Sequence, residues 1–295
     1  MDNKDLRRRL LAGLPVTERR LDVAGVSTTV LEGGDGPPLV LLHGGIESGG
    51  VYWARVVSRL AESHALVVPD VPGLGESEPV DRLDHEVFAG WFTALLRETC
   101  REKPTLIAHS LLGSLAGRFA TRHGDVLHRL VIYGSPGIGP YRLPLGLIVA
   151  LIRSDLRPTE RNLERFMSWP FLDPERLVGE DPEWFEAFAA HMVSCGSVAH
   201  VKRTMRGLLR AGIKQVPEGE LERIPVPTAL VWGRHDRMVP LRVCEWTSAR
   251  LGWPMHVIEG AGHVPHVEQP EAFVRVLHAV MEGSAARVDS PRARV

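Results

Sequence analysis

The segment of residues 104–113, Pro-Thr-Leu-Ile-Ala-His-Ser-Leu-Leu-Gly, is the sequence feature that most constrains the fold of this chain. Residues 105–108 form a short apolar run typical of a buried strand, and residues 111–122 have the apolar spacing of a helix. Ser110 therefore lies on a strand-to-helix turn. A serine at such a turn is a candidate nucleophile, although most serines at helix starts serve only as caps.

Similar strand and helix patterns alternate on both sides of this turn. Residues 17–32 hold two alternating stretches around Ala24-Gly25, which predict an antiparallel hairpin at the edge of a sheet. Further strands are predicted at 38–42, 65–68, 130–133, 227–232 and 255–258, and helices at 51–62, 84–101, 241–251 and 268–282. This alternation predicts an α/β fold, with a mostly parallel central sheet and helices on both faces. In such sheets, ligands bind at the carboxyl ends of the strands.

The alternation is interrupted by a long helical insertion. From about residue 141 to residue 215 the sequence offers no strand candidate, only helical patterns separated by prolines. We therefore predict a core in two parts, 1–138 with an N-terminal arm and 218–283, and a helical cap at 139–217. Residues 284–295 lack apolar periodicity, which predicts a flexible tail.

Charge and composition bear on the partners of the chain. With 35 basic and 36 acidic residues, the formal net charge of −1 favours neither nucleic acid nor a membrane surface. We expect a small-molecule substrate, apolar or weakly acidic, and a monomer or homodimer. Gly13 and Pro15 interrupt the apolar run that follows the basic N-terminus, so no secretory signal is expected. The odd number of cysteines, three, is typical of reduced thiols in a cytoplasmic protein.

Two later strand ends offer partners for Ser110. Asp236 follows the predicted strand 227–232, and His263 follows the predicted strand 255–258. Loops that follow parallel strands emerge at one edge of the sheet, so these residues can meet the serine. The alternative acid is Asp70, which follows an earlier strand. The order serine, aspartate, histidine favours Asp236.

These motifs, taken together, resemble the alpha/beta-hydrolase superfamily over residues 40–279. The matching segments are Leu-Leu-His-Gly-Gly at 41–45, Pro-Asp-Val-Pro-Gly-Leu-Gly-Glu-Ser at 69–77, the serine turn, Trp-Gly-Arg-His-Asp at 232–236 and Gly-Ala-Gly-His at 260–263. The capped subgroup is the most similar, which includes small-molecule esterases, lactonases and hydrolases of ring-fission products. The cap segments 157–165 and 171–174 resemble the lid of that last group.

The resemblance implies an alpha/beta-hydrolase fold with an inserted helical cap, and it assigns roles to particular residues. Ser110 would be the nucleophile, His263 its base and Asp236 the acid that orients the base. The backbone N–H groups of Gly45 and Leu111 would form the oxyanion hole. No cofactor and no metal are expected.

Residues beside these positions are candidate substrate contacts, namely Gly44, Ile46, His109, Val239 and Val264. A lone histidine is more often structural than functional, which is the bland interpretation of His43, His109 and His235.

A basic row recurs at near-helical spacing within the cap, at Lys202, Arg203, Arg206 and Arg210. A solvated helix face explains it best, whereas an inward-facing member would bind an acidic substrate.

Three functions remain open from the sequence. The first is a serine hydrolase that cleaves a small carboxylic ester or lactone through an acyl-enzyme. The second is a carbon–carbon bond hydrolase of ring-fission products, which ranks lower because Val264 stands where those enzymes usually present a tryptophan. The third is a non-catalytic ligand-binding protein on the same fold.

The turn itself departs from the usual G-x-S-x-G pattern, because Ala108 and Leu112 occupy the two glycine positions. We expect the turn to be kept with shifted packing, and Gly113 to relieve the crowding one residue late.

Overall fold

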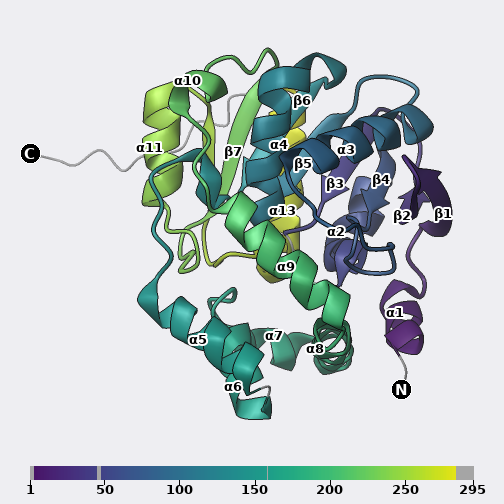
Figure 1. Ribbon diagram of the computed structural model, residues 1–295, viewed down its shortest axis with the longest axis vertical. Coiled ribbons are helices and arrows are strands. Elements are labelled where there is room, and N and C mark those ends of the chain that lie inside the picture. The colour runs from purple at the N-terminus through teal and green to yellow at the C-terminus, as the bar shows by residue number, and fades with distance from the viewer. Residues whose placement is uncertain (1–2, 45–47, 158, 284–295) are drawn as a thin grey trace, which may run out of the picture.

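The computed structural model describes residues 3–44, 48–157 and 159–283, and its central feature is a sheet of eight strands. The strands lie in the order β1-β2-β4-β3-β5-β6-β7-β8 (Figure 1). Their bounds are β1 Thr17–Val23, β2 Val26–Gly33, β3 Pro38–Leu42, β4 Ala65–Pro69, β5 Thr105–His109, β6 Arg129–Tyr133, β7 Thr228–Gly233 and β8 Met255–Ile258. The pairs β1/β2 and β2/β4 are antiparallel, and all the other neighbouring pairs are parallel.

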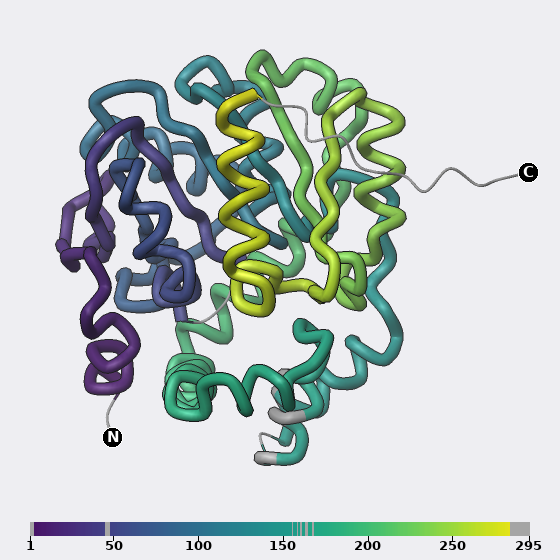
Figure 2. The backbone as a smooth tube through the Cα atoms, turned by 180° about the vertical axis from the view of Figure 1, so that it is seen from behind, coloured from purple at the N-terminus to yellow at the C-terminus, as the bar shows by residue number. Residues whose placement is uncertain are grey.

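Helices cover both faces of this sheet, as Figures 1 and 2 show from opposite sides. The helices and 3-10 turns that flank the sheet strands are α1 Asn3–Leu11, η1 Gly49–Trp53, α2 Ala54–Leu60, α3 His85–Thr99, α4 Ser110–His123, η2 Gly124–Val126, η3 Pro136–Ile138, α10 Glu218–Leu221, α11 Arg242–Leu251, α12 Pro265–Glu268 and α13 Pro270–Met281. Apolar side chains of α3, α4 and α11 share one core cluster with the sheet. Those of α2 and α13 share a second cluster on the opposite face.

The strand β3 illustrates why the sequence is apolar throughout its strands. Val40 and Leu42 belong to the first core cluster, whereas Leu39 and Leu41 belong to the second. Successive side chains of a strand point to opposite faces, so a strand covered on both sides needs an unbroken apolar run. The same reason explains why β5, which leads to Ser110, is fully buried.

Between η3 and α10 the described residues form five helices, here called the cap helices. They are α5 Leu145–Leu156, α6 Glu160–Met167, α7 Pro174–Glu180, α8 Pro182–Gly196 and α9 Ala199–Gly212. Helices α5 to α8 form a layer below the carboxyl edge of the sheet, and α9 crosses back toward α4 (Figure 1). The N-terminal helix α1 packs against α8, with Leu6 and Leu10 in one apolar cluster with Phe188 and Met192.

The predicted fold class is confirmed by this mostly parallel sheet with helices on both faces and a helical insertion. The helix expected over 268–282 is α13, which begins two residues later, and a separate short helix, α12, precedes it and ends at Glu268. Pro270 starts the second helix, where its missing N–H removes no helical hydrogen bond. The predicted flexible tail, 284–295, lies outside the described residues. Within them, no helix is both long and apolar enough to cross a bilayer.

Candidate active site

Ser110 lies at the junction of β5 and α4, where the chain turns sharply. Its φ angle is +50°, in the left-handed region that residues other than glycine rarely adopt. The residue before it, His109, is extended, with φ −102° and ψ 144°. A non-glycine residue persists in this conformation only where the surrounding structure enforces it, and such residues concentrate at functional sites.

The strand β5 and the loop after β6 approach helix α4 most closely at Gly113. A Cβ atom at Gly113 would lie 3.0 Å from the Ala108 carbonyl oxygen and 3.0 Å from Ser135 Cβ. Leu112 is instead fully buried in the core cluster between the helix and the sheet. The contact that usually requires a glycine two residues after the serine is therefore made three residues after it, which explains why Leu112 fits.

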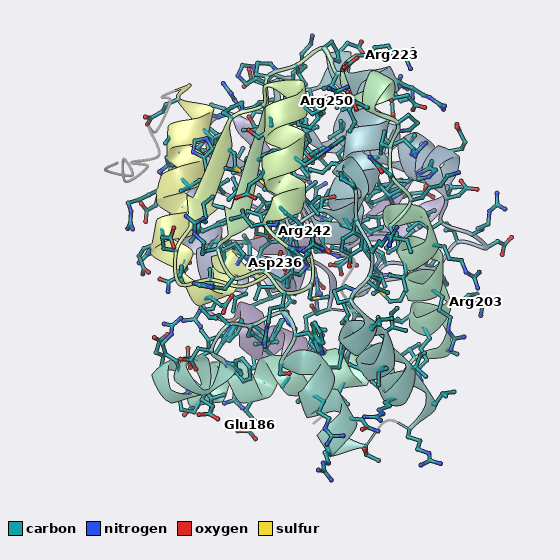
Figure 3. The ribbon with its side chains drawn as sticks, turned by 90° about the vertical axis from the view of Figure 1, so that its left-hand side faces the viewer. Glu186, Arg203, Arg223, Asp236, Arg242 and Arg250 are labelled. Atoms are coloured by element: carbon teal, nitrogen blue, oxygen red, sulfur yellow. The ribbon has the colours of Figure 1, made fainter. Side chains whose placement is uncertain are left out.

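Two side chains from later loops meet Ser110. His263 Nε2 lies 3.0 Å from Ser110 Oγ, and His263 Nδ1 lies 2.8 Å from Asp236 Oδ2. Asp236 follows β7 and His263 follows β8, two neighbouring parallel strands that end at the same edge. Figure 3 shows Asp236 between the strands and the cap helices.

Asp236 is held on both carboxylate oxygens. Its Oδ1 accepts hydrogen bonds from the backbone N–H groups of Met238 at 2.9 Å and Val239 at 2.8 Å. Its Oδ2 faces His263 Nδ1. A carboxylate only accepts, so Nδ1 carries the imidazole proton and Nε2 is left to accept the Ser110 hydroxyl proton. The arrangement therefore presents a hydroxyl, a base that can take its proton and a fixed negative charge behind that base.

Of the two predicted oxyanion donors, Leu111 lies within the described residues and Gly45 does not. Leu111 is in the first turn of α4, where backbone N–H groups have no acceptor within the helix. The end of α9 packs on this residue, since a Cβ atom on Gly212 would lie 2.9 Å from Leu111 Cα. Gly45 lies outside the described residues, as does the predicted substrate contact Ile46.

His109 is buried beneath the site instead of facing open space. Its Nδ1 lies 3.0 Å from the Tyr52 hydroxyl, and its Nε2 lies 3.0 Å from the main-chain oxygen of His263. A carbonyl only accepts, so Nε2 carries the proton and Nδ1 accepts from Tyr52. Burial lowers the pKa of His109 well below its ordinary value, with His263 and His266 adding to the effect. His109 is thus a neutral donor that holds the loop of His263.

The other predicted contacts are packing positions. Gly44 is half-buried, and a Cβ atom there would lie 2.2 Å from His109 Nδ1. Val239 is 3% exposed and contributes its N–H group to Asp236. Val264 is also 3% exposed and belongs to an apolar cluster with Phe171 of the cap.

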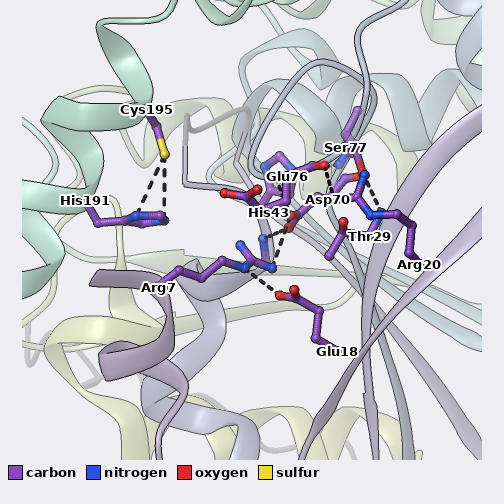
Figure 4. A network of polar contacts seen from close by, with 12 residues as sticks. Arg7, Glu18, Arg20, Thr29, His43, Asp70, Glu76, Ser77, His191 and Cys195 are labelled. Atoms are coloured by element: carbon purple, nitrogen blue, oxygen red, sulfur yellow. Dashed lines mark hydrogen bonds and ion pairs between the residues drawn. The ribbon is translucent and has the colours of Figure 1, made fainter. Parts of the chain in front are cut away.

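Asp70 belongs to a separate buried network (Figure 4). It forms an ion pair with Arg7 Nη2 at 3.2 Å and accepts N–H groups from Gly50 at 2.5 Å and Glu76 at 2.8 Å. Burial raises the pKa of Asp70, against the opposing effect of the Arg7 guanidinium. Arg7 also donates from Nε to Glu18 at 2.7 Å. These bonds occupy the Asp70 carboxylate, and Asp236 is the aspartate that contacts His263.

The basic row of the cap lies on helix α9 and faces solvent. Arg203, Arg206 and Arg210 are exposed, and Lys202 is half-buried. Figure 3 shows Arg203 pointing away from the body of the molecule.

Metal binding has no ready site in the ranges that the structure describes, because no group of three or more histidine, cysteine, aspartate or glutamate side chains is suitably arranged. Two polar residues near His263 were not found by sequence reasoning. Tyr52 hydrogen-bonds His109, and Glu268 is buried beside the His263 loop. The only signal for Glu268 was its place in a predicted helix, which gives no reason to expect a buried carboxylate.

Comparison with known proteins agrees with this fold. A model of the alpha/beta hydrolase family matches residues 39–276. The chain is 26% identical to a 2-hydroxymuconate semialdehyde hydrolase of Pseudomonas sp. (strain CF600), over 89% of this chain and 93% of that protein. It is 26% identical to a pimeloyl-[acyl-carrier protein] methyl ester esterase of Aeromonas hydrophila, over 85% of this chain and 98% of that one. A crystal structure of a carboxylesterase from Bacillus subtilis superposes with a TM-score of 0.79 at 20% identity, covering 95% and 97% of the two chains. The chain therefore belongs to the alpha/beta hydrolase family, and the protein is a hydrolase.

Proposed function

We propose that this protein is a serine hydrolase that cleaves a small carboxylic ester or lactone through an acyl-enzyme. The observation that carries the proposal is the contact of His263 Nε2 with Ser110 Oγ at 3.0 Å, on a serine whose φ angle is +50°. A neutral hydroxyl is a weak nucleophile, so a neighbouring base is what the chemistry needs. The esterase relative from Aeromonas hydrophila supports an ester substrate.

In the proposed reaction, Ser110 Oγ attacks the carbonyl carbon while its proton passes to His263 Nε2. Asp236 stabilises the imidazolium that forms, through its 2.8 Å contact with Nδ1. The N–H groups of Leu111 and Gly45 are the proposed donors to the oxyanion. His263 then returns its proton to the leaving alcohol, and water attacks the acyl-enzyme by the same route. Each oxyanion donor is worth about 3 kcal/mol in the barrier.

The test combines turnover with covalent labelling. We expect the purified protein to hydrolyse short p-nitrophenyl esters and to be labelled at Ser110 by a fluorophosphonate, as mass spectrometry of the tryptic peptide would show. Ser110→Ala should lose both. Ser114→Ala is the matched control, because Ser114 is a buried serine of the same helix that contacts Ser135 at 2.8 Å. Absence of both turnover and labelling in the wild-type protein would contradict the proposal.

A second candidate is hydrolysis of a carbon–carbon bond in a ring-fission product. The Pseudomonas relative, a 2-hydroxymuconate semialdehyde hydrolase, supports this candidate. Val264, in place of the usual tryptophan after the histidine, argues against it. The two are separated by a yellow dienoate substrate, whose absorbance should remain unchanged with this protein if the ester function is right.

The cellular location, the oligomeric state and the polarity of the substrate remain predictions. A cytoplasmic location agrees with the reduced state of Cys100, Cys195 and Cys244 in the described residues. We also propose that the protein is a monomer or homodimer. Its proposed substrate is apolar or weakly acidic.

A further inference from the structure

A short part of the cap, residues 168–172, lies between the two loops that carry Asp236 and His263. It connects α6 to α7 and is here called the cap connector. The loop of Asp236 contacts it through Arg237, whose Nη2 donates to the main-chain oxygens of Ser168 at 2.5 Å and Phe171 at 2.9 Å. The connector is therefore bonded to the residue next to the proposed acid.

The loop of His263 contacts the same connector through its main chain. The His263 N–H group donates to the Pro170 carbonyl oxygen at 2.8 Å. A Cβ atom on Gly262 would lie 2.8 Å from that same oxygen and 3.0 Å from the Leu172 nitrogen, so the connector approaches the loop as closely as a glycine allows. On its other side, the His263 carbonyl accepts from His109 at 3.0 Å. Both main-chain polar groups of His263 are thus held.

Glu268 joins these two segments with one carboxylate. Its Oε1 accepts the Leu172 N–H group of the connector at 2.6 Å, and its Oε2 accepts the Gly262 N–H group at 2.6 Å. The residue is 2% exposed, and burial raises the pKa of its carboxyl against the opposing effect of these N–H donors. Arg176, from α7 of the cap, lies beside it and donates to the Glu268 main-chain oxygen at 3.0 Å.

A buried carboxylate costs free energy, and a buried amide or apolar residue could fill the same space. What a carboxylate adds is a pair of acceptors at a fixed separation. We infer that Glu268 and Arg237 are positioning residues, which fix the cap connector against the loops of His263 and Asp236 so that the cap contributes to the chemical step. This inference rests on the proposed function, because it concerns the same histidine and aspartate.

The expected kinetic effect follows from geometry. Glu268→Gln keeps the size of the side chain but replaces one acceptor by an NH₂ group, which then faces an N–H donor. The loop of His263 must shift to relieve this contact, and a displacement of about 1 Å in an active site can lower the rate by about 10²-fold. Neither Glu268 nor Arg237 is placed among the substrate contacts, so KM should change little while kcat falls.

The chain offers a matched control in the same two loops. Arg234 and Glu259 form an exposed ion pair at 2.6 Å, which also joins the loop after β7 to the loop after β8. Arg234 precedes Asp236 by two positions, and Glu259 precedes His263 by four. In the described residues, the side chains of Arg234 and Glu259 hydrogen-bond each other and not the cap connector. Glu259→Gln and Arg234→Met should therefore leave kcat within about twofold, as expected for an exposed pair.

The experiment measures two independent quantities on the full-length wild-type protein and on the variants E268Q, R237M, E259Q and R234M. The first is kcat and KM with a short p-nitrophenyl ester. The second is amide hydrogen exchange of the peptides that contain residues 168–172 and 260–265. We expect E268Q to lower kcat by about 10- to 100-fold with KM within about twofold, and R237M to lower it less. Exchange should become faster in both peptides together.

Each outcome has one consequence. If E268Q and R237M are folded, with kcat and exchange at wild-type values, the inference is wrong. It is also wrong if the controls lose kcat as much as E268Q does. If E268Q does not fold, R237M alone decides, because its exposed side chain can be replaced without burying a new polar group. A wild-type protein without esterase activity contradicts the proposed function, while faster exchange of both peptides in E268Q would still support the coupling between them.

Discussion

Two pairs of an aspartate and a histidine lie at the carboxyl edge of the sheet. In the described part of the chain, only one of the two histidines lies within hydrogen-bond distance of a serine hydroxyl. Asp70 follows β4 and His43 follows β3, whereas Asp236 follows β7 and His263 follows β8. The first pair is sealed, since both residues have no exposed surface. The second opens to Ser110, with His263 between the serine and the aspartate.

The two pairs differ in the partners of their aspartate and histidine side chains. Asp70 pairs with the buried guanidinium of Arg7, and His43 accepts the Val71 N–H group at 3.2 Å instead of facing a carboxylate. Burial, with a smaller effect of Arg7, lowers the pKa of His43 to about 3. An aspartate already neutralised by an arginine cannot stabilise a second positive charge on an imidazole. An aspartate and a histidine at the sheet edge are therefore not sufficient for catalysis. The additional residue decides the role of the pair: Arg7 makes the first pair structural, whereas Ser110 makes the second a candidate for catalysis.

The largest effect is expected from the removal of the Ser110 hydroxyl, which distinguishes the second pair from the first. Ser110→Ala should lower kcat for a p-nitrophenyl ester by about 10⁶-fold, as in other hydrolases that lose the nucleophile of a triad. The fold should persist, because alanine fits where the serine hydroxyl stood. Steady-state kinetics on protein checked by circular dichroism measures this. A variant with more than about 1% of wild-type activity would break the comparison, because Ser110 would then not be the distinguishing group.

The next effect compares the two aspartates directly. Asp236→Asn should lower kcat by about 10⁴-fold, because an amide no longer fixes the His263 tautomer or stabilises its charge. Asp70→Asn should leave kcat per folded molecule near the wild-type value and lower the midpoint of thermal unfolding. Kinetics and thermal unfolding of both variants give the answer. Equal kinetic losses would mean that Asp70 also acts in the reaction.

A smaller effect is expected on stability when the buried ion pair between Arg7 and Asp70 is removed. Arg7→Met leaves the Asp70 charge buried without its partner, so the free energy of unfolding should fall by about 3–5 kcal/mol. Urea denaturation measures this loss, and kcat should be unchanged at temperatures where the variant is folded. Arg8→Met is the control, because its partner Asp5 and Arg8 itself lie at the surface. A loss below about 1 kcal/mol would show that Arg7 is dispensable for sealing Asp70.

The smallest effect expected from a single residue is a dependence of stability on pH. Burial lowers the pKa of His43 and His266 to about 3 and that of His191 to about 4. The unfolded chain binds protons at these residues near pH 6.5, whereas the folded chain does not. Stability is therefore present above pH 6.5 and is lost as the pH falls toward these folded values, by up to about 1.4 kcal/mol per pH unit and histidine.

Urea denaturation at pH 7, 6 and 5 tests this sign. His43→Gln should flatten the dependence by up to about 1.4 kcal/mol per pH unit. The raised pKa values of Asp70 and Glu268 act in the opposite direction, because these carboxyls favour the folded state as they become protonated. Three histidines oppose two carboxyls, so the histidine effect should dominate as the pH falls from 6.5 to 5. An unchanged slope in the variant would mean that His43 is not neutral in the folded state.

Much of the architecture could be predicted because its causes are local. Apolar runs such as 38–42 become strands covered on both faces, and the loss of strand patterns after residue 139 marks the cap helices. The short helix α12 before Gln269 was not predicted, because four residues are too few to show an apolar periodicity. Pro270 marks a helix start as readily as an interruption, and this ambiguity is not resolved by periodicity alone.

The sequence order of Ser110, Asp236 and His263 was sufficient to name these residues together, because parallel strands must place their following loops at one edge. Other relations had no such rule. Arg7 reaches Asp70 from the N-terminal helix, Pro170 reaches the main chain of His263 from the cap, and Glu268 turns inward from a short helix. Each depends on how separate elements pack, and spacing along the chain carries no information about such contacts. The linear pattern therefore fixes which strand ends carry polar residues, whereas packing fixes which of those residues are neutralised, sealed or left facing a serine.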